Sequence, residues 1–98
     1  MEYTFIIQST HSSLKGHFPN NPVIPGVVIL DEVFNIIKTS KPEFTIDSIP
    51  MVKFIHPLLP EQKVIVEIKN KNETVINFSC SHNNTKLVTG QLVLSRLS

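Results

Sequence analysis

The alternation of apolar and polar residues predicts a strand followed by one helix in the first half of the chain. Residues Tyr3 to Gln8 (YTFIIQ) are rich in β-branched and aromatic types, which is typical of a strand. A helix is expected from Gly26 to about Thr39, because Pro25 suits the first helical turn and Ser40–Pro42 ends the pattern. The first half of the helix, VVIL, is apolar on every side, and such a helix is normally buried and not laid on a surface.

The second half of the chain has the pattern of antiparallel strands. Val64, Val66 and Ile68 alternate with residues of the opposite face, as in a strand with one face buried. Short polar turns separate the apolar runs, which indicates hairpins. Strands are expected over Ile46–Ile55, Lys63–Lys69, Thr74–Ser81 and Leu87–Leu97. With the first strand they predict an α+β domain, in which a sheet of about five antiparallel strands wraps the long helix.

The bulk properties are those of one folded domain spanning residues 1–98. The 98 residues are 41% hydrophobic and the apolar residues lie in patterned runs, which argues against disorder. Nine Lys and Arg against eight Asp and Glu give a formal net charge of +1, too balanced for a dedicated nucleic-acid-binding protein. No apolar stretch is long enough to cross a bilayer, so no membrane association is expected.

The N-terminus and the cysteine content indicate the compartment. The first residues, MEYTFIIQST, have neither a basic n-region nor a small-residue cleavage site, so no signal peptide is expected. Cys80 has no second cysteine with which to form an internal disulfide, which fits a reducing setting. Since Cys80 lies within an apolar strand pattern, we expect a core position for it and a cytoplasmic protein.

The segment from Gly16 to Val33, GHFPNNPVIPGVVILDEV, concentrates the candidate chemistry. Each of its three prolines fixes a backbone φ angle, which narrows the conformations open to the loop before the helix. His17 stands in this stiff loop, where a side chain is positioned at little further entropy cost. An imidazole titrates close to neutral pH, so His17 is a candidate general base or acid. The alternative is that His17 only caps or bridges the loop.

The expected helix carries a candidate acid. Asp31 shares a helix face with Val27, Val28 and Phe34, and a carboxylate in apolar surroundings tends to stay protonated, as a general acid must. The alternative is that Asp31 reaches the edge of the core and is solvated there. Periodicity does not choose between Asp31 and Glu32, because both neighbour apolar positions.

Gly26 is the third candidate, at the start of the helix. The first N–H groups of a helix have no partner within it, and the helix dipole adds positive potential there. Since Gly26 has no side chain, a ligand oxygen can approach its amide closely, and the amide could then stabilise an enolate-like transition state. The alternative is that glycine stands here for packing alone.

Other kinds of site find little support in the sequence. The four histidines, His11, His17, His56 and His82, form no HExxH motif, and a single cysteine cannot build a thiolate zinc site. There is no GxSxG for a nucleophilic serine and no glycine-rich phosphate loop. We therefore expect neither a metal nor an organic cofactor.

The segments Gly16–Val33 and Val52–Ile68 (VKFIHPLLPEQKVIVEI) resemble the hotdog-fold 3-hydroxyacyl-[acyl-carrier-protein] dehydratases. The resemblance implies a long central helix wrapped by an antiparallel sheet, and usually a dimer whose sheets join edge to edge. It implies that the catalytic pair meets across the dimer interface, with the histidine from one subunit and the acid from the other.

Carried over by position, the resemblance gives His17 the role of catalytic histidine and Asp31 that of its acidic partner. Gly26 matches the glycine whose amide binds the thioester carbonyl. The chain has Asp31 where the branch with the most similar loop usually has Glu, and a dehydratase–isomerase branch has Asp. Asn20 also replaces a common glycine. These departures leave the acyl substrate and any isomerase activity open.

The expected reaction is dehydration of 3-hydroxyacyl-[acyl-carrier-protein] to the trans-2-enoyl form, in fatty-acid or polyene-type biosynthesis. The acyl chain would lie in an apolar tunnel past Phe18 and Val27, in a homodimer or higher oligomer. The partner, acyl carrier protein, is acidic, and basic side chains could offer docking charge. These are Lys15, Lys53, Lys63, Lys86 and Arg96. The alternatives are a hotdog acyl thioesterase and a non-catalytic subunit of a heteromeric dehydratase.

Overall fold

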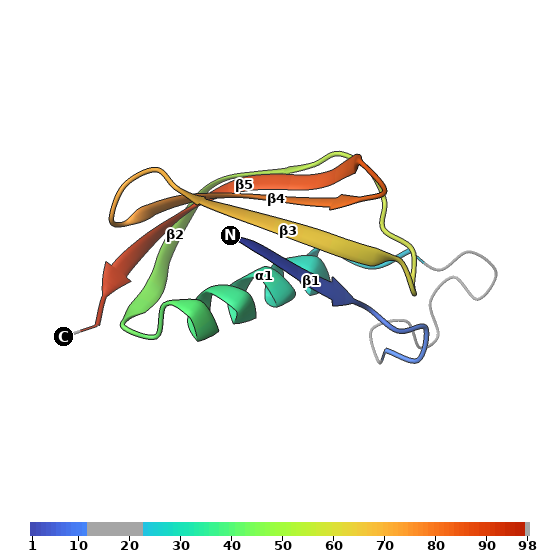
Figure 1. Cartoon of the computed structure of the whole chain (residues 1–98), viewed down its shortest axis with the longest axis horizontal. Helices are drawn as coiled ribbons and strands as arrows, with labels where there is room; N and C mark the ends of the chain where they lie inside the picture. Colours follow the sequence, from blue (N-terminus) through green and yellow to red (C-terminus); the bar gives the residue numbers. More distant parts are fainter. Residues whose placement is uncertain (12–22, 98) are drawn as a thin grey trace.

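The structure, a computed structural model, describes residues 1–11 and 23–97. In these ranges the chain forms one helix and five strands (Figure 1). In chain order they are β1 (Glu2–Ile6), α1 (Gly26–Ser40), β2 (Phe44–Phe54), β3 (Lys63–Asn70), β4 (Val75–His82) and β5 (Thr85–Arg96). The α+β prediction is confirmed, and no element boundary differs from the expected one by more than two residues. No helix in the described ranges has the length and apolar character needed to span a membrane.

The strands form one antiparallel sheet with the order β1-β3-β4-β5-β2. β3, β4 and β5 are consecutive in the chain and adjacent in the sheet. In the turn between β4 and β5, Asn83 and Asn84 have φ angles of 48° and 67°, the left-handed pair typical of a type I′ hairpin turn. β1 and β2 form the two edges, and α1 lies against one face of the sheet (Figure 1).

The core lies between α1 and the sheet. The alternation predicted for β3 is confirmed, since Val64, Val66 and Ile68 are all buried. Burying one such side chain stabilises a fold by about 1.5–3 kcal/mol relative to leaving it exposed. The residues that α1 buries recur at the spacing of one helix face: Val28, Ile29, Val33 and Ile37.

The burial expected for the apolar start of α1 is found at Val28 and Ile29 but not at Val27. Val27 is 64% exposed, and Asp31 is exposed as well. The described strands form a single sheet, and a single layer covers only one stripe of a helix. The face of α1 that carries Val27 and Asp31 is therefore open in a single chain. In that chain Asp31 is solvated, which agrees with the alternative of a carboxylate at the edge of the core.

Gly90 on β5 lies opposite Phe78 on β4. A Cβ atom at Gly90 would lie 2.5 Å from Cε1 of Phe78 and 2.9 Å from the main-chain oxygen of Met51 on β2. Phe78 is 3% exposed, so its ring has no free space into which to move. Glycine is required at this position because two neighbouring strands approach the backbone closely.

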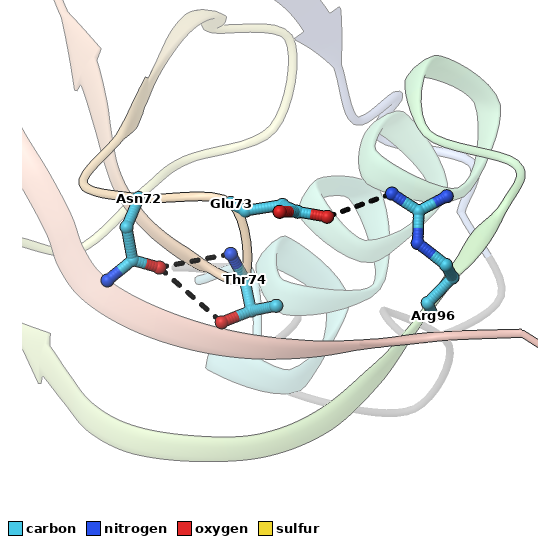
Figure 2. A network of polar contacts seen from close by, with 4 residues as sticks. All are labelled: Asn72, Glu73, Thr74 and Arg96. Atoms are coloured by element: carbon cyan, nitrogen blue, oxygen red, sulfur yellow. Dashed lines mark hydrogen bonds and ion pairs between the residues drawn. The ribbon is translucent and has the colours of Figure 1, made fainter.

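Polar side chains fix the end of the sheet where β5 finishes (Figure 2). Oδ1 of Asn72 accepts hydrogen bonds from the backbone N–H of Thr74 at 3.0 Å and from its hydroxyl at 3.4 Å. Arg96 donates to Glu73 at 2.9 Å, and its guanidinium lies 4.9 Å from the ring centroid of Phe44. The β3–β4 turn is thereby joined to the end of β5 and the start of β2.

Cys80 occupies the core position expected for it on β4. Its side chain is fully buried, and burial raises the pKa of the thiol from 9.0 to about 12. A buried thiol that stays protonated is chemically inert and packs as a small apolar side chain.

Candidate active site

The N-terminus of α1 lies at the end of the molecule opposite to that network (Figure 1). Gly26 is its first residue, and Pro25 before it has the extended backbone of an N-cap, with φ −58° and ψ 142°. The N–H of Val28 donates to the carbonyl oxygen of Pro25 at 3.0 Å, but no described side chain caps this end of the helix. The positive end of the helix dipole is therefore available to an oxygen atom of a ligand.

A cavity of about 440 Å³ lies at this helix end. The main-chain N–H of Ile24 donates to the oxygen of Leu58 at 2.8 Å, which joins the segment before α1 to the segment after β2. The lining is mostly apolar: Val23, Ile24, Gly26, Ile29, Phe54, Ile55, His56, Pro57 and Leu58. An apolar cavity beside a helix N-terminus suits a ligand with a hydrocarbon part and a carbonyl group.

The ring of Phe54 lies over Gly26. A Cβ atom at Gly26 would lie 2.6 Å from Cε1 and 2.7 Å from Cζ of that ring. Packing of the Phe54 ring therefore favours glycine at this helix start. The ring is nevertheless at the surface, since Phe54 is 54% exposed, so it has open space into which it can move. Packing against Phe54 in its present position and close approach of a ligand both favour a residue without a side chain at position 26.

Asp31 and Val27 lie on another side of α1 from this cavity. They are four positions apart and so share a face, whereas the cavity is lined from the helix by Gly26 and Ile29. In a single chain, over the residues described, neither Asp31 nor Val27 lines the cavity at Gly26. The other two site residues expected from the sequence, His17 and Phe18, lie outside the described residues.

The structure distinguishes the two neighbouring carboxylates of α1. Glu32 is half-buried and lines a second cavity, of about 410 Å³, between α1 and β1. The other lining residues are Tyr3, Asn35, Ile36, Thr39 and Ser40. Asp31 is exposed on a different side of the helix, so the two carboxylates lie on different surfaces of the molecule.

The cavity wall that follows β2 was not predicted from the sequence. Phe54, Ile55 and His56 were assigned only to the end of a strand, although they lie in the second segment that carries the family resemblance. That resemblance was the available signal. Hydrophobic periodicity gave none, because this wall is built by a contact between segments far apart in the chain.

Comparison with known proteins agrees with the fold and with the motif. The family model described as ApeI-like, ApeI dehydratase, matches residues 1–91. The chain belongs to the ApeI-like dehydratase family. The resemblance to hotdog-fold dehydratases is thereby confirmed.

Relatives of this ApeI-like chain include 3-hydroxyacyl-[acyl-carrier-protein] dehydratases named FabZ. The one from Ehrlichia ruminantium (strain Gardel) is 32% identical over 77 residues, covering 66% of this chain and 53% of the relative. The one from Ehrlichia canis (strain Jake) is 31% identical over 78 residues, with the same coverage. The chain thus spans about half the length of the curated relatives it matches.

Solved structures match the ApeI-like chain over nearly its whole length. The dehydratase heterocomplex ApeI:P from Xenorhabdus doucetiae contains a chain with a TM-score of 0.85 and 28% identity, covering 97% of this chain and 86% of that one. An uncharacterized protein from Erwinia carotovora matches with a TM-score of 0.85 and 25% identity, covering 97% and 82%. The fluoroacetyl-CoA thioesterase FlK matches with a TM-score of 0.59 and 10% identity, covering 99% and 85%, which shows a shared hotdog fold alone.

Proposed function

We propose that this chain catalyses the reversible removal of water from a 3-hydroxyacyl thioester carried on acyl carrier protein, giving the trans-2-enoyl thioester. The observation that carries the proposal is the N-terminus of α1 at Gly26, which no described side chain caps and which lies beside an apolar cavity in a chain of the ApeI-like dehydratase family. The activity in the names of the FabZ relatives supports it.

Three groups would divide the chemistry. The N–H of Gly26 would donate to the thioester oxygen, where negative charge develops as the C2 proton leaves. His17 would take that proton as general base. Asp31 would protonate the departing C3 hydroxyl, so that the products are the enoyl thioester and one water molecule. The reaction needs neither a metal nor an organic cofactor.

A homodimer would complete this site. Asp31 lies on a different side of α1 from the cavity, so a second copy of the chain is the proposed means of bringing an acid to it. β2 is an edge strand with an unpaired side, and Ile49 and Met51 on it are 42% and 49% exposed. A free strand edge with exposed apolar residues favours pairing with another strand. We therefore propose that two copies pair through their β2 edges.

The proposed docking surface for acyl carrier protein is smaller than the full set of basic residues. Lys53 near the end of β2, Lys63 at the start of β3 and Lys86 at the start of β5 are exposed near the cavity end of the sheet. Arg96 lies at the opposite end, where it pairs with Glu73 (Figure 2). Lys15, the fifth basic residue of the predicted set, lies outside the described residues. We propose that the three lysines, and not Arg96, attract the acidic carrier.

Mass spectrometry of a 3-hydroxyacyl carrier protein incubated with the purified chain tests the proposal. We expect the loss of one water from the acyl group with the wild-type chain. The His17→Ala and Asp31→Asn variants should be slower by about 10²-fold or more, because each loses a proton-transfer group. Loss of the whole acyl group, with a free thiol on the carrier, would instead identify a thioesterase.

A second candidate function is that of one subunit in a heteromeric dehydratase. The observation that favours it is the match to a chain of a dehydratase heterocomplex. An inactive chain that becomes active only when mixed with a second hotdog chain would support this candidate. Repeating that mixture with His17→Ala then assigns the catalysis: a lost activity places it in this chain, and an unchanged activity places it in the partner.

A further inference from the structure

Two histidines flank the start of β5 from opposite sides. His82 ends β4 and lies opposite Thr85 in the β4–β5 pair. The main-chain N–H of His56, just after β2, donates to the oxygen of Leu87 at 3.3 Å. Figure 1 shows the segment after β2 passing close to the β4–β5 turn. Residues 26 positions apart in sequence are thereby brought to one place in the fold.

The hydrogen bonds of the two imidazole rings fix their tautomers. Nδ1 of His82 lies 2.7 Å from the main-chain oxygen of Lys63, and Nδ1 of His56 lies 2.8 Å from that of Pro57. A carbonyl oxygen can only accept a hydrogen bond, so Nδ1 carries the proton in each ring. In the neutral ring Nε2 then has a free lone pair, which is the form that binds a metal ion.

His56 and His82 both line one pocket of about 280 Å³, the histidine pocket, whose other lining residues are Gln62, Asn83, Thr85 and Leu87. Its walls are held by short-range structure. Oε1 of Gln62 accepts a hydrogen bond from the N–H of Leu59 at 3.0 Å, and Asn83 sits in the left-handed turn that joins β4 to β5. A pocket with fixed walls can orient ligating groups before an ion arrives.

We infer that Nε2 of His56 and Nε2 of His82 together bind a divalent transition-metal ion such as Zn²⁺ or Ni²⁺ in the histidine pocket. Imidazole nitrogen is a preferred ligand for these ions. A carbonyl that holds the N–H of the other ring nitrogen is the support that ligating histidines usually have. The inference does not depend on the proposed dehydratase activity.

The site has two imidazoles and leaves the remaining coordination positions to water. Within residues 1–11 and 23–97, no three His, Cys, Asp or Glu side chains come together as a metal-binding group. We therefore expect exchangeable binding, weaker than that of a structural zinc site with four protein ligands. His56 also lines the cavity at the N-terminus of α1. An ion bound by His56 and His82 would therefore link one wall of that cavity to the β4–β5 hairpin.

Titration calorimetry of the tag-free, full-length chain with ZnCl₂ and with NiCl₂ tests the inference. We expect one ion per chain for the wild type, and affinities lower by about tenfold or more for His56→Gln and for His82→Gln. The matched control His11→Gln should bind as the wild type does. Circular dichroism confirms that each variant is folded before the titration.

Two results would overturn the inference. One is the absence of binding to the wild type at millimolar metal. The other is binding that is unchanged in both His56→Gln and His82→Gln, because the ion would then sit elsewhere. Neither result bears on the dehydratase proposal, since its assay contains no added metal.

Discussion

Two glycines in this chain each leave room for a phenylalanine ring, one inside the sheet and one at the cavity. At Gly90 both the ring of Phe78 and the main-chain oxygen of Met51 lie within 3 Å of where a Cβ would be. At Gly26 all three of the nearest atoms belong to the ring of Phe54. Phe78 is 3% exposed and Phe54 is 54% exposed. The same local arrangement therefore fixes the backbone in the core, whereas at the cavity it leaves a ring that can move.

The surroundings of Gly90 support stability, whereas the surroundings of Gly26 provide surface for function. The core side, with Phe78 and Gly90, has no space for rearrangement, and it supports the sheet. The cavity side, with Phe54 and Gly26, exposes apolar surface and a helix end that none of the described side chains caps, and both are features that a ligand or a second chain would cover. Each of the following substitutions tests whether this division is correct.

Truncating the two rings should give the largest difference. Phe78→Ala should lower the free energy of unfolding by about 3–5 kcal/mol, because it leaves a cavity in the core. Phe54→Ala should cost about 1 kcal/mol or less, because much of its surface is already in water. Urea denaturation of both variants measures the difference. Equal losses would show that the ring over Gly26 is as firmly packed as the ring over Gly90.

Adding a methyl group at Gly90 should be the next largest effect. Gly90→Ala should lower the free energy of unfolding by about 1–3 kcal/mol, as is typical of overpacking. The double variant Gly90→Ala/Phe78→Leu should recover only part of this loss, because the Met51 carbonyl still obstructs the methyl group. Thermal or urea unfolding gives both values. Full recovery would mean that the ring alone requires the glycine.

Gly26→Ala should change stability by less than about 1 kcal/mol, since Phe54 can swing away and alanine favours helix. Its dehydratase kcat/KM should nevertheless fall about tenfold or more, because the methyl group crowds the amide that would bind the thioester oxygen. Steady-state kinetics on a 3-hydroxyacyl carrier protein measures the fall.

The double variant Gly26→Ala/Phe54→Ala is the control for that result. It removes the displaced ring and leaves the methyl group beside the amide. If it stays impaired relative to Phe54→Ala alone, crowding of the amide is the cause. If it recovers the activity of Phe54→Ala, Gly26 serves only to accommodate the ring.

The last expected effect is a pH dependence of the free energy of unfolding, which comes from the buried side. The pKa of the Cys80 thiol is about 12 in the folded chain, against 9.0 as its ordinary value. Above pH 9 the unfolded chain loses the thiol proton while the folded chain keeps it, so stability falls as pH rises toward 12. The slope from this group is at most about 1.4 kcal/mol per pH unit.

Urea denaturation between pH 8 and pH 10 on the wild type and on Cys80→Ala isolates this effect. Other groups titrate in both proteins, so only the difference between the two slopes reports the thiol. The wild type should lose stability more steeply. Parallel curves would mean that water reaches Cys80 in the folded chain.

Much of the fold follows from short-range pattern. The alternation at Val64, Val66 and Ile68 predicted β3, and the Pro25–Gly26 pair predicted the start of α1. The exposure of Val27 could not be obtained in this way, because it depends on how many layers cover the helix. The contact of Phe54 with Gly26 and the meeting of His56 with His82 depend on strand order and register, to which local sequence gives little access.

The order of strands in the sheet also bears on how the molecule assembles. β3, β4 and β5 pair with their neighbours in sequence, so only short turns must close. Pairing of β1 with β3 joins Ile6 to Lys63, and pairing of β2 with β5 joins Phe44 to Arg96, and both require long loops to close. We expect the central hairpins to form early and the edge strands to join them late. The cavity wall after β2 would then be among the last parts to become ordered and among the first to open.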